Sequence, residues 1–279
     1  MSVQIIVDST TDLLPELKAR VQVVPLTVHF GDREYIDGVT IDHKTFYEML
    51  VESDTLPSTS QATPGAFSEV YHQITQNGDS AVVLTLSQHL SGTYQSAVIA
   101  AQDYADIHVV DTSSAAIGGG ILTELALQLA DSGMDAGTIA RTLEEEKKNI
   151  RVVAMLDTLE YLKRGGRISK TVALAGALLN IKPVVALTDG QIQMLGKARG
   201  SKQGNNLLAQ EIEKCGGVDF AKPVLLGYTG MSDVLLQKYI NDSRHLWENG
   251  AESLRYTCIG SVIGTHAGPG AVAVAFFEK

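Results

Sequence analysis

The chain is short of cysteine and of basic residues, and each shortage excludes a class of protein. Its two cysteines, Cys215 and Cys258, form no CxxC pair, so neither a disulfide framework nor a cysteine metal site is expected. Asp and Glu (32 residues) outnumber Lys and Arg (22 residues), which gives a formal net charge of −10. A chain this acidic is repelled by nucleic acid and by anionic membranes, so neither is an expected partner.

Long apolar runs are also missing. The longest, such as residues 172–179, are too short to span a bilayer. The N-terminus lacks the basic start and the long apolar core of a signal peptide. With 279 residues, 44% of them hydrophobic, the chain can form one large domain or two lobes with a shared core. We therefore expect a soluble, cytoplasmic protein without stable membrane insertion.

Common catalytic and cofactor motifs are absent too. There is no GxSxG elbow, no HExxH motif and no paired His/Cys spacing. Residues 190–198 resemble a P-loop, but they have one residue too many between the glycines, and Ala198 replaces the metal-binding hydroxyl. The sequence thus predicts no cofactor and no metal. A triad of Ser91, His266 and an Asp stays compatible with the sequence, because triads assemble from distant residues, but no motif supports one.

The order of strands and helices predicts an α/β fold of two lobes. Strands expected at residues 3–7, 81–86, 107–110 and 151–156 alternate with helices, which is typical of a parallel sheet with helices on both faces. After residue 156 the pattern changes, and Asp189-Gly190 is a strong signal for a hairpin between strands at 184–187 and 192–195. We predict a mainly parallel N-terminal lobe, residues 1–156, and a C-terminal α+β lobe with a mixed or antiparallel sheet, residues 157–279.

Smaller elements follow from local signals. A hairpin is expected where Gly31-Asp32 separates the strand region 21–30 from residues 33–36. Residues 169–179 are expected to form a helix rich in small residues. The triple glycine at 118–120 lies in the first turns of an expected helix, where it suggests close packing of backbone or ligand.

A polar turn in residues 81–101 is the first candidate site. An apolar strand passes through Ser91, Gly92 and Thr93 into a helix. Such a turn brings free backbone N–H groups, hydroxyls and the positive end of a helix together, which suits an anion or a carboxylate. The alternative is that Ser91 or Thr93 only caps the helix.

Three further stretches carry candidate residues. Residues 56–65 place Thr59, Ser60 and Gln61 between two prolines, as a stiff loop of donors or as a polar linker. His266 is expected in a loop shaped by glycine and proline, where its neutral or charged ring can bond a carboxylate. Arg167 and Arg199 lie in two basic, glycine-bearing segments that suit a phosphate or an acidic partner, or are simply solvated loops. Asp8 is expected to brace a loop, with a catalytic role as the alternative.

Taken in order, these segments resemble one protein family. The segments are Asp8-Ser9 with Asp12-Leu13, Thr59-Ser60-Gln61 before Pro64, the sequence LSGTYQSA at 90–97, residues 162–168, and GTHAGPG at 264–270. Together they are similar to the DegV family, the fatty-acid-binding proteins that serve as the FakB subunit of bacterial fatty acid kinase. The resemblance covers essentially the whole chain. One departure is Ala62, where the family often has proline.

The resemblance implies a two-lobe carrier with its ligand site between the lobes. One long-chain fatty acid would lie in an apolar tunnel, its carboxylate held by Thr59 or Ser60, by the turn Ser91, Gly92 and Thr93, and by His266. The carrier would have no ATP site and no enzymatic activity of its own. A separate kinase subunit would phosphorylate the bound fatty acid, with Arg167 and Arg199 beside the acyl phosphate or the kinase surface. The alternative function is a stand-alone Ser/His acyl hydrolase.

Overall fold

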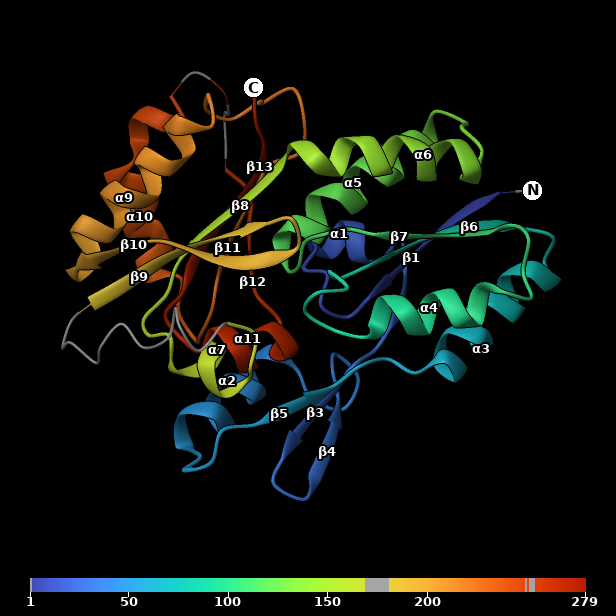
Figure 1. Cartoon of the computed structure of the whole chain (residues 1–279), viewed down its shortest axis with the longest axis horizontal. Coiled ribbons are helices and arrows are strands. Elements are labelled where there is room, and N and C mark those ends of the chain that lie inside the picture. The colour runs from blue at the N-terminus through green and yellow to red at the C-terminus, as the bar shows by residue number, and fades with distance from the viewer. Residues whose placement is uncertain (1, 169–180, 249, 251–253) are drawn as a thin grey trace.

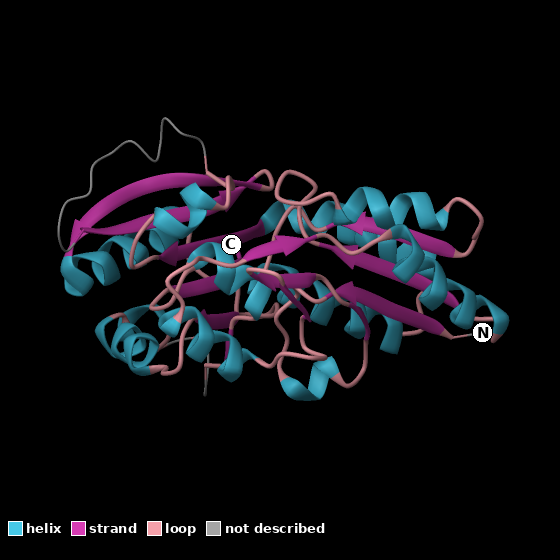
Figure 2. Cartoon of the chain, turned by 90° about the horizontal axis from the view of Figure 1, so that it is seen from below, coloured by secondary structure: helices cyan, strands magenta, loops and turns pink. Residues whose placement is uncertain are grey.

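The computed structural model describes residues 2–168, 181–248, 250 and 254–279. These residues form three sheets with helices packed against them (Figure 1 and Figure 2). The two larger sheets lie side by side along the long axis of the molecule, and the smallest lies below them in the view of Figure 1. The helix expected at 169–179 lies outside the described residues. Among the helices that are described, none has the length and apolar character needed to cross a membrane.

A four-stranded parallel sheet forms the N-terminal part, as the alternating pattern predicts. In the strand Val3–Asp8, Ile5 and Val7 pack on one helical layer and Ile6 packs on the other. In the neighbouring strand Ser80–Thr85, Val82 and Leu84 share the layer of Ile5 and Val7. Figure 1 shows one helix pair above this sheet and one pair below it. In sheet order the strands are β2 (Gln22–Val24), β1 (Val3–Asp8), β6 (Ser80–Thr85) and β7 (Ile107–Asp111), and the helices are α3 (Pro64–Gln76), α4 (Thr93–Ala101), α5 (Ile117–Asp131) and α6 (Ala136–Glu146).

Asp8 braces the ends of two of these strands. Its Oδ1 accepts from the backbone N–H (2.9 Å) and the hydroxyl (2.6 Å) of Thr10, and its Oδ2 accepts from the N–H of Leu86 (2.7 Å). Burial raises the pKa of Asp8 to about 6, against the opposing effect of these donors. The bracing role is confirmed, and with its oxygens directed at the backbone Asp8 is not presented to a ligand.

A three-stranded antiparallel sheet lies beside the parallel one. It contains the predicted hairpin of β3 (Thr27–Phe30) and β4 (Arg33–Ile36), and its other edge is β5 (Ser58–Ser60). Helix α2 (His43–Glu52) follows, with Asp42 capping the N–H of Thr45. The expectation that residues 56–65 form only a loop is wrong at β5. Pro57 and Pro64 flank the strand rather than interrupt it, and an edge strand tolerates proline nearby.

The third sheet is mixed, as predicted for the C-terminal lobe. Asp189 and Gly190 form its hairpin turn, both with positive φ. The six strands, in sheet order, are β10 (Gln191–Arg199), β9 (Ile181–Thr188), β8 (Ile150–Met155), β13 (Val272–Phe277), β11 (Leu225–Tyr228) and β12 (Tyr256–Cys258), with β11 and β12 parallel and the other neighbours antiparallel. The remaining helices are α1 (Pro15–Lys18), α7 (Glu160–Arg164), α9 (Gly200–Lys214), α10 (Val234–Asp242) and α11 (Ser261–Ala267), with short 3₁₀ turns at Lys147–Asn149 and Arg244–Leu246.

Strand β8 is where the sequence-based assignment differs from the structure. It was expected to continue the parallel sheet, but it lies antiparallel between β9 and β13. Alternation of strands and helices along the chain does not reveal which sheet a strand joins, since that depends on pairing with β13 far downstream. The division into lobes at residue 156 stays a prediction, and the change of sheet precedes it, at β8.

Helix α5 joins the two large sheets. It contacts β1 and β6 of the parallel sheet and β8, β11 and β13 of the mixed sheet. A Cβ at Gly120 would overlap the backbone oxygen of Asp12, so glycine permits this close approach. The close packing predicted for the triple glycine is confirmed, and it brings the start of α5 to the boundary between the sheets.

Candidate ligand-binding site

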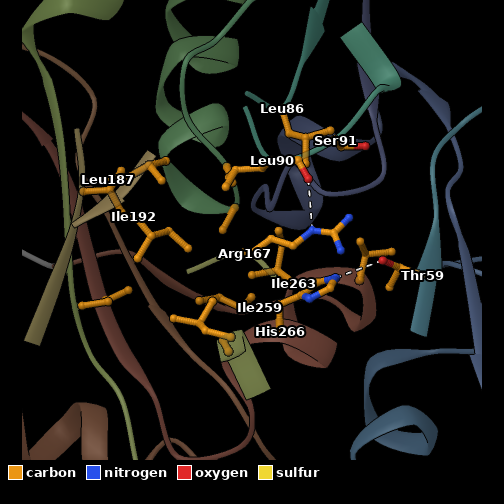
Figure 3. A pocket seen from close by; sticks show the side chains of 18 of the residues that line it. Thr59, Leu86, Leu90, Ser91, Arg167, Leu187, Ile192, Ile259, Ile263 and His266 are labelled. Carbon is orange, nitrogen blue, oxygen red and sulfur yellow. Dashed lines mark hydrogen bonds between the residues drawn. The ribbon is translucent and has the colours of Figure 1, made fainter. Parts of the chain in front are cut away.

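A cavity of about 400 Å³ lies where the two large sheets meet. Aliphatic side chains from the start of α5, from β8, β9 and β10, and from α11 form most of its wall. Figure 3 shows Leu187 and Ile192 on one side of this space and Thr59, Ser91 and His266 on the other, with Arg167 between them. The cavity is therefore apolar with a polar end, to which four separate segments contribute.

Strand β5 orients the first polar residue. Thr59 pairs with the buried Val28 on β3 and directs its Oγ1 toward His266 Nε2, 2.9 Å away. Ser60, one residue on, also lines the cavity, but its exposed hydroxyl is directed to the other face of the strand, where it lies 2.7 Å from His29 Nε2. Because side chains alternate across a strand, Thr59 is the hydroxyl directed at the polar end.

His266 occupies the last turn of α11 rather than the expected loop. Of the residues that suggested a loop, Gly264 lies inside the helix, whereas Gly268, Pro269 and Gly270 follow it; Gly268, with φ of 72°, is the C-cap residue. Among the described residues Nδ1 of His266 has no hydrogen-bond partner, and a Cβ on Gly165 would overlap this atom. The helix thus fixes the ring between Thr59 and the backbone of Gly165.

His266 is neutral at physiological pH. Burial, followed by the positive charge of Arg167, lowers its pKa to about 4. If the proton lies on Nε2, the imidazole donates to Thr59 Oγ1 and leaves the hydroxyl proton of Thr59 free for a ligand. With the proton on Nδ1, a buried N–H would be left without an acceptor, which is costly. The first tautomer fits a Thr59 hydroxyl that serves an anion.

Arg167 lies in the cavity wall, whereas Arg199 does not. The Arg167 Nε donates to the carbonyl of Leu90 at 3.1 Å, and Nη1 donates to the carbonyl of Gly165 at 2.5 Å. Arg199 is exposed at the end of β10, and its backbone N–H donates to Gln203 Oε1 at 2.9 Å. The two basic segments that look alike in sequence therefore occupy different places.

In the turn before α4 the N-cap residue is Gly92, and neither Ser91 nor Thr93 is the capping residue that the sequence offered as the alternative. Ser91 Oγ lies 3.0 Å from Thr93 Oγ1 and accepts from the N–H of Thr93 at 3.3 Å. Ser91 and Gly92 line the cavity, while Thr93 is fully buried behind them. Ser91 thus orders the start of the helix and also faces the cavity, and Thr93 supports Ser91.

Gln61 was grouped with Thr59 and Ser60 in the sequence, but its contact with α4 was not predicted. Its Nε2 donates to Ser96 Oγ at 2.9 Å, and a Cβ on Gly92 would overlap its Oε1. Gln61 therefore connects the segment after β5 to α4 and sets the spacing of Thr59 and Ser91. The amide directly after two hydroxyls was the available signal, but its contact with α4 depends on tertiary packing.

Within the described residues no three His, Cys, Asp or Glu side chains form a cluster suited to a metal ion.

Comparison with known proteins agrees with this architecture. An α/β fold whose large sheets enclose an apolar cavity with a polar end is typical of proteins that bind a small ligand. A family model described as "Uncharacterised protein, DegV family" matches residues 2–279. The chain belongs to the DegV family.

Relatives match over nearly their full length. A DegV domain-containing protein of Deinococcus radiodurans is 35% identical over 282 residues, 99% of this chain and 98% of that protein. Another, from Caldanaerobacter subterraneus, is 34% identical over 284 residues, 99% of both chains.

Solved structures share the fold. A fatty-acid-binding DegV family protein from Thermus thermophilus is 30% identical, with a TM-score of 0.88 and 100% of both chains covered. A stearic-acid-binding protein from Eubacterium ventriosum is 26% identical, with a TM-score of 0.88, covering 100% of this chain and 99% of that one. The Streptococcus pneumoniae fatty acid kinase B3 protein, loaded with linoleic acid, is 22% identical with a TM-score of 0.87 over 100% of both chains, which shows the common fold.

Proposed function

We propose that the chain binds one long-chain fatty acid in the cavity and presents its carboxylate to a separate kinase subunit. The observation that carries the proposal is an aliphatic cavity that ends at Thr59, Ser91, His266 and Arg167. Fatty acids bound by relatives of the same fold, such as the Thermus and Eubacterium proteins, support it.

The two ends of the cavity match the two ends of such a ligand. Each methylene that leaves water contributes about 0.8 kcal/mol, so the acyl chain supplies most of the affinity. Hydrogen bonds to a charged group contribute about 1.5–3 kcal/mol each, and Thr59 and Ser91 are the proposed donors. Arg167 supplies the positive charge that balances the carboxylate, while neutral His266 orients Thr59.

The proposed reaction belongs to the partner. The kinase would transfer the γ-phosphoryl group of ATP to a carboxylate oxygen, forming the acyl phosphate and releasing ADP. This chain would bind the acyl group, keep water from it and offer the carboxylate; Arg167 and the exposed Arg199 are the proposed contacts for the phosphoryl group and the kinase. A cytoplasmic location, where such a kinase would have ATP, stays part of the proposal.

The alternative of a Ser/His hydrolase has less support. A general-base histidine needs an acid or carbonyl to orient its second nitrogen. Among the described residues no group bonds Nδ1 of His266, and Nε2 faces Thr59 rather than Ser91. The pKa of about 4 also makes this imidazole a weak base.

One set of measurements tests the proposal. The purified protein is denatured, its lipid is extracted and identified by mass spectrometry, and the delipidated protein is titrated with stearic acid and with the alcohol of equal chain length. We expect about one fatty acid per chain and at least roughly tenfold weaker binding of the alcohol. Acyl phosphate should form when the kinase subunit and ATP are added. Absence of lipid together with no binding would refute the carrier function, and turnover of acyl esters by the chain alone would favour the hydrolase.

A further inference from the structure

The hairpin of β9 and β10 reaches from the mixed sheet to the parallel-sheet side of the cavity. Leu187 on β9 and Ile192 on β10 line the cavity on the side opposite the polar groups (Figure 3). Thr188 and Asp189 at the tip are exposed, but Gly190 is buried. The buried face of the tip therefore rests on another part of the chain.

Ser87 is the residue on which this tip rests. The Ser87 hydroxyl, fully buried, donates to the carbonyl of Gly190 at 2.7 Å. Its oxygen also accepts from the N–H of His89 at 3.1 Å, and its backbone N–H donates to the carbonyl of Ser114 at 2.7 Å. Ser87 is thus fixed by the parallel-sheet side and bonded to the hairpin, although it does not line the cavity.

The fit at this contact is tight. A Cβ on Gly190 would overlap the Ser87 hydroxyl and lie 3.1 Å from the His89 ring. Gly190 also has φ of 74°, which the turn requires. A buried carbonyl that loses its donor bears the full desolvation penalty, so the hydroxyl of Ser87 holds the tip in one position.

We propose that Ser87 is a positioning residue that sets the length of acyl chain the cavity accepts. Through Gly190 it holds Leu187 and Ile192 as the wall at the apolar end. The inference rests on the proposed function, since it names a limit on the same ligand. An acyl chain that is too long must displace this wall, and the Ser87–Gly190 hydrogen bond opposes that displacement.

The test uses the ratio of two affinities rather than one affinity. Delipidated wild-type protein and Ser87→Ala are titrated with straight-chain saturated fatty acids of increasing length. In the wild type, affinity should rise with length to an optimum and then fall. In Ser87→Ala the affinity of the first over-long acid, divided by that of the optimal acid, should increase about tenfold. A general loss of stability, or a disturbed Ser91, weakens all lengths alike and leaves the ratio unchanged.

Two further variants complete the test. Ser114→Ala is the matched control, because Ser114 is also a buried serine but its hydroxyl has no hydrogen-bond partner among the described residues; it should keep the wild-type ratio. Gly190→Ala pushes the tip away from Ser87 and should raise the ratio even if Ser87→Ala fails to fold. An unchanged ratio in the folded variants overturns the inference while the proposed function stands. Failure of the wild type to bind any fatty acid overturns the proposed function itself.

Discussion

Thr59 and His266 are coupled through one hydrogen bond, so their substitution should not be additive. Thr59→Val removes the hydroxyl that faces the ligand and should weaken fatty-acid binding by about 1–3 kcal/mol. His266→Ala should cost a similar amount, because Thr59 then loses its donor. His266→Gln keeps an N–H donor and should retain much of the affinity. Calorimetry on delipidated protein measures all three.

The double variant decides whether the two residues act together. With Thr59 already replaced by Val, His266→Ala should add little, which gives a coupling energy of about 1 kcal/mol or more. Ser60→Ala is the control, since its hydroxyl faces His29 on the other side of β5. Additive losses from Thr59→Val and His266→Ala would mean that each side chain contacts the ligand independently.

The buried carboxyl of Asp12 should make the stability of the fold depend on pH. Its Oδ1 accepts from the N–H of Gly260 at 2.8 Å, just before α11, and its Oδ2 has no partner among the described residues. Burial raises the pKa of Asp12 well above 3.8; the nearby acids Asp37 and Asp8 raise it further, and Lys18 opposes them. The folded state therefore binds more protons than the unfolded state, and stability falls as the pH rises from the unfolded pKa through the folded one.

Asp12→Asn should remove this dependence, because the amide oxygen can still accept from Gly260. Between about pH 5 and about pH 8 the variant should gain about 1 kcal/mol or more over the wild type in the free energy of unfolding. Urea unfolding at both pH values measures it. The control is Asp42→Asn at the exposed cap of α2, where the Thr45 donors lower the pKa; because that carboxyl is ionised in the folded and the unfolded state from about pH 5 upwards, the difference between this variant and the wild type should stay the same at the two pH values. Parallel pH profiles for Asp12→Asn and wild type would contradict the assignment.

At the scale of elements, local signals in the sequence predicted strands and hairpins well. Asp189-Gly190 and Gly31-Asp32 mark hairpin turns because few residues adopt positive φ. What local signals did not predict was which distant segments pair. β8 joins β13 across more than a hundred residues of chain, and β5 pairs with β3 despite flanking prolines. Helix α11 was hidden because it has only seven residues, contains Gly264 and is followed directly by Gly268 and Pro269, a composition typical of a loop.

In the candidate site, too, local sequence signals predicted some features, and features that depend on distant contacts were missed. The residue types, namely hydroxyls on a strand–turn–helix and a histidine near glycines, were visible in the sequence. The choice of Thr59 over Ser60 was not, because it depends on the register of β5 against β3. The place of Arg167 inside the cavity also depends on how α7 packs against α11, which no single-sequence pattern encodes.

Gly165, directly after α7, tests how closely that helix must pack against α11. Its backbone is helical, with φ of −68°, so alanine fits the backbone, but the new Cβ would overlap His266 Nδ1. Gly165→Ala should therefore displace the imidazole and weaken fatty-acid binding about tenfold with the fold intact. Fluorescence displacement measures the affinity, and circular dichroism checks the fold. Gly65→Ala in the first turn of α3 meets no atom closer than 3.9 Å and should leave affinity unchanged. Equal affinities for Gly165→Ala and wild type would show that the ring tolerates movement.

For the whole molecule, the two basic segments separate ligand binding from partner binding. Arg167 connects the segment after α7 to the turn before α4 through Leu90, inside the cavity. Arg199 lies outside it, at the end of β10. A ligand that bridges both sheets should stabilise the protein as a unit, in proportion to its concentration relative to the dissociation constant. Loss of Arg167 should reduce that stabilisation, and loss of Arg199 should not.

The family resemblance implied that both arginines lie beside the acyl phosphate or the kinase surface, and the geometry now predicts different outcomes for them. Arg167→Ala should weaken fatty-acid binding by about 1–3 kcal/mol, since it removes the charge opposite the carboxylate, and acyl-phosphate formation should fall with it. Arg167→Lys keeps the charge but not the fork that bonds Leu90 and Gly165, and should recover only part of the affinity. Arg199→Ala should bind fatty acid like the wild type and still lower turnover by the kinase subunit. Calorimetry with stearic acid and acyl-phosphate formation at saturating lipid separate the two effects. If Arg199→Ala lost affinity for the lipid, or Arg167→Ala kept all of it, the division of roles between cavity and surface would be wrong.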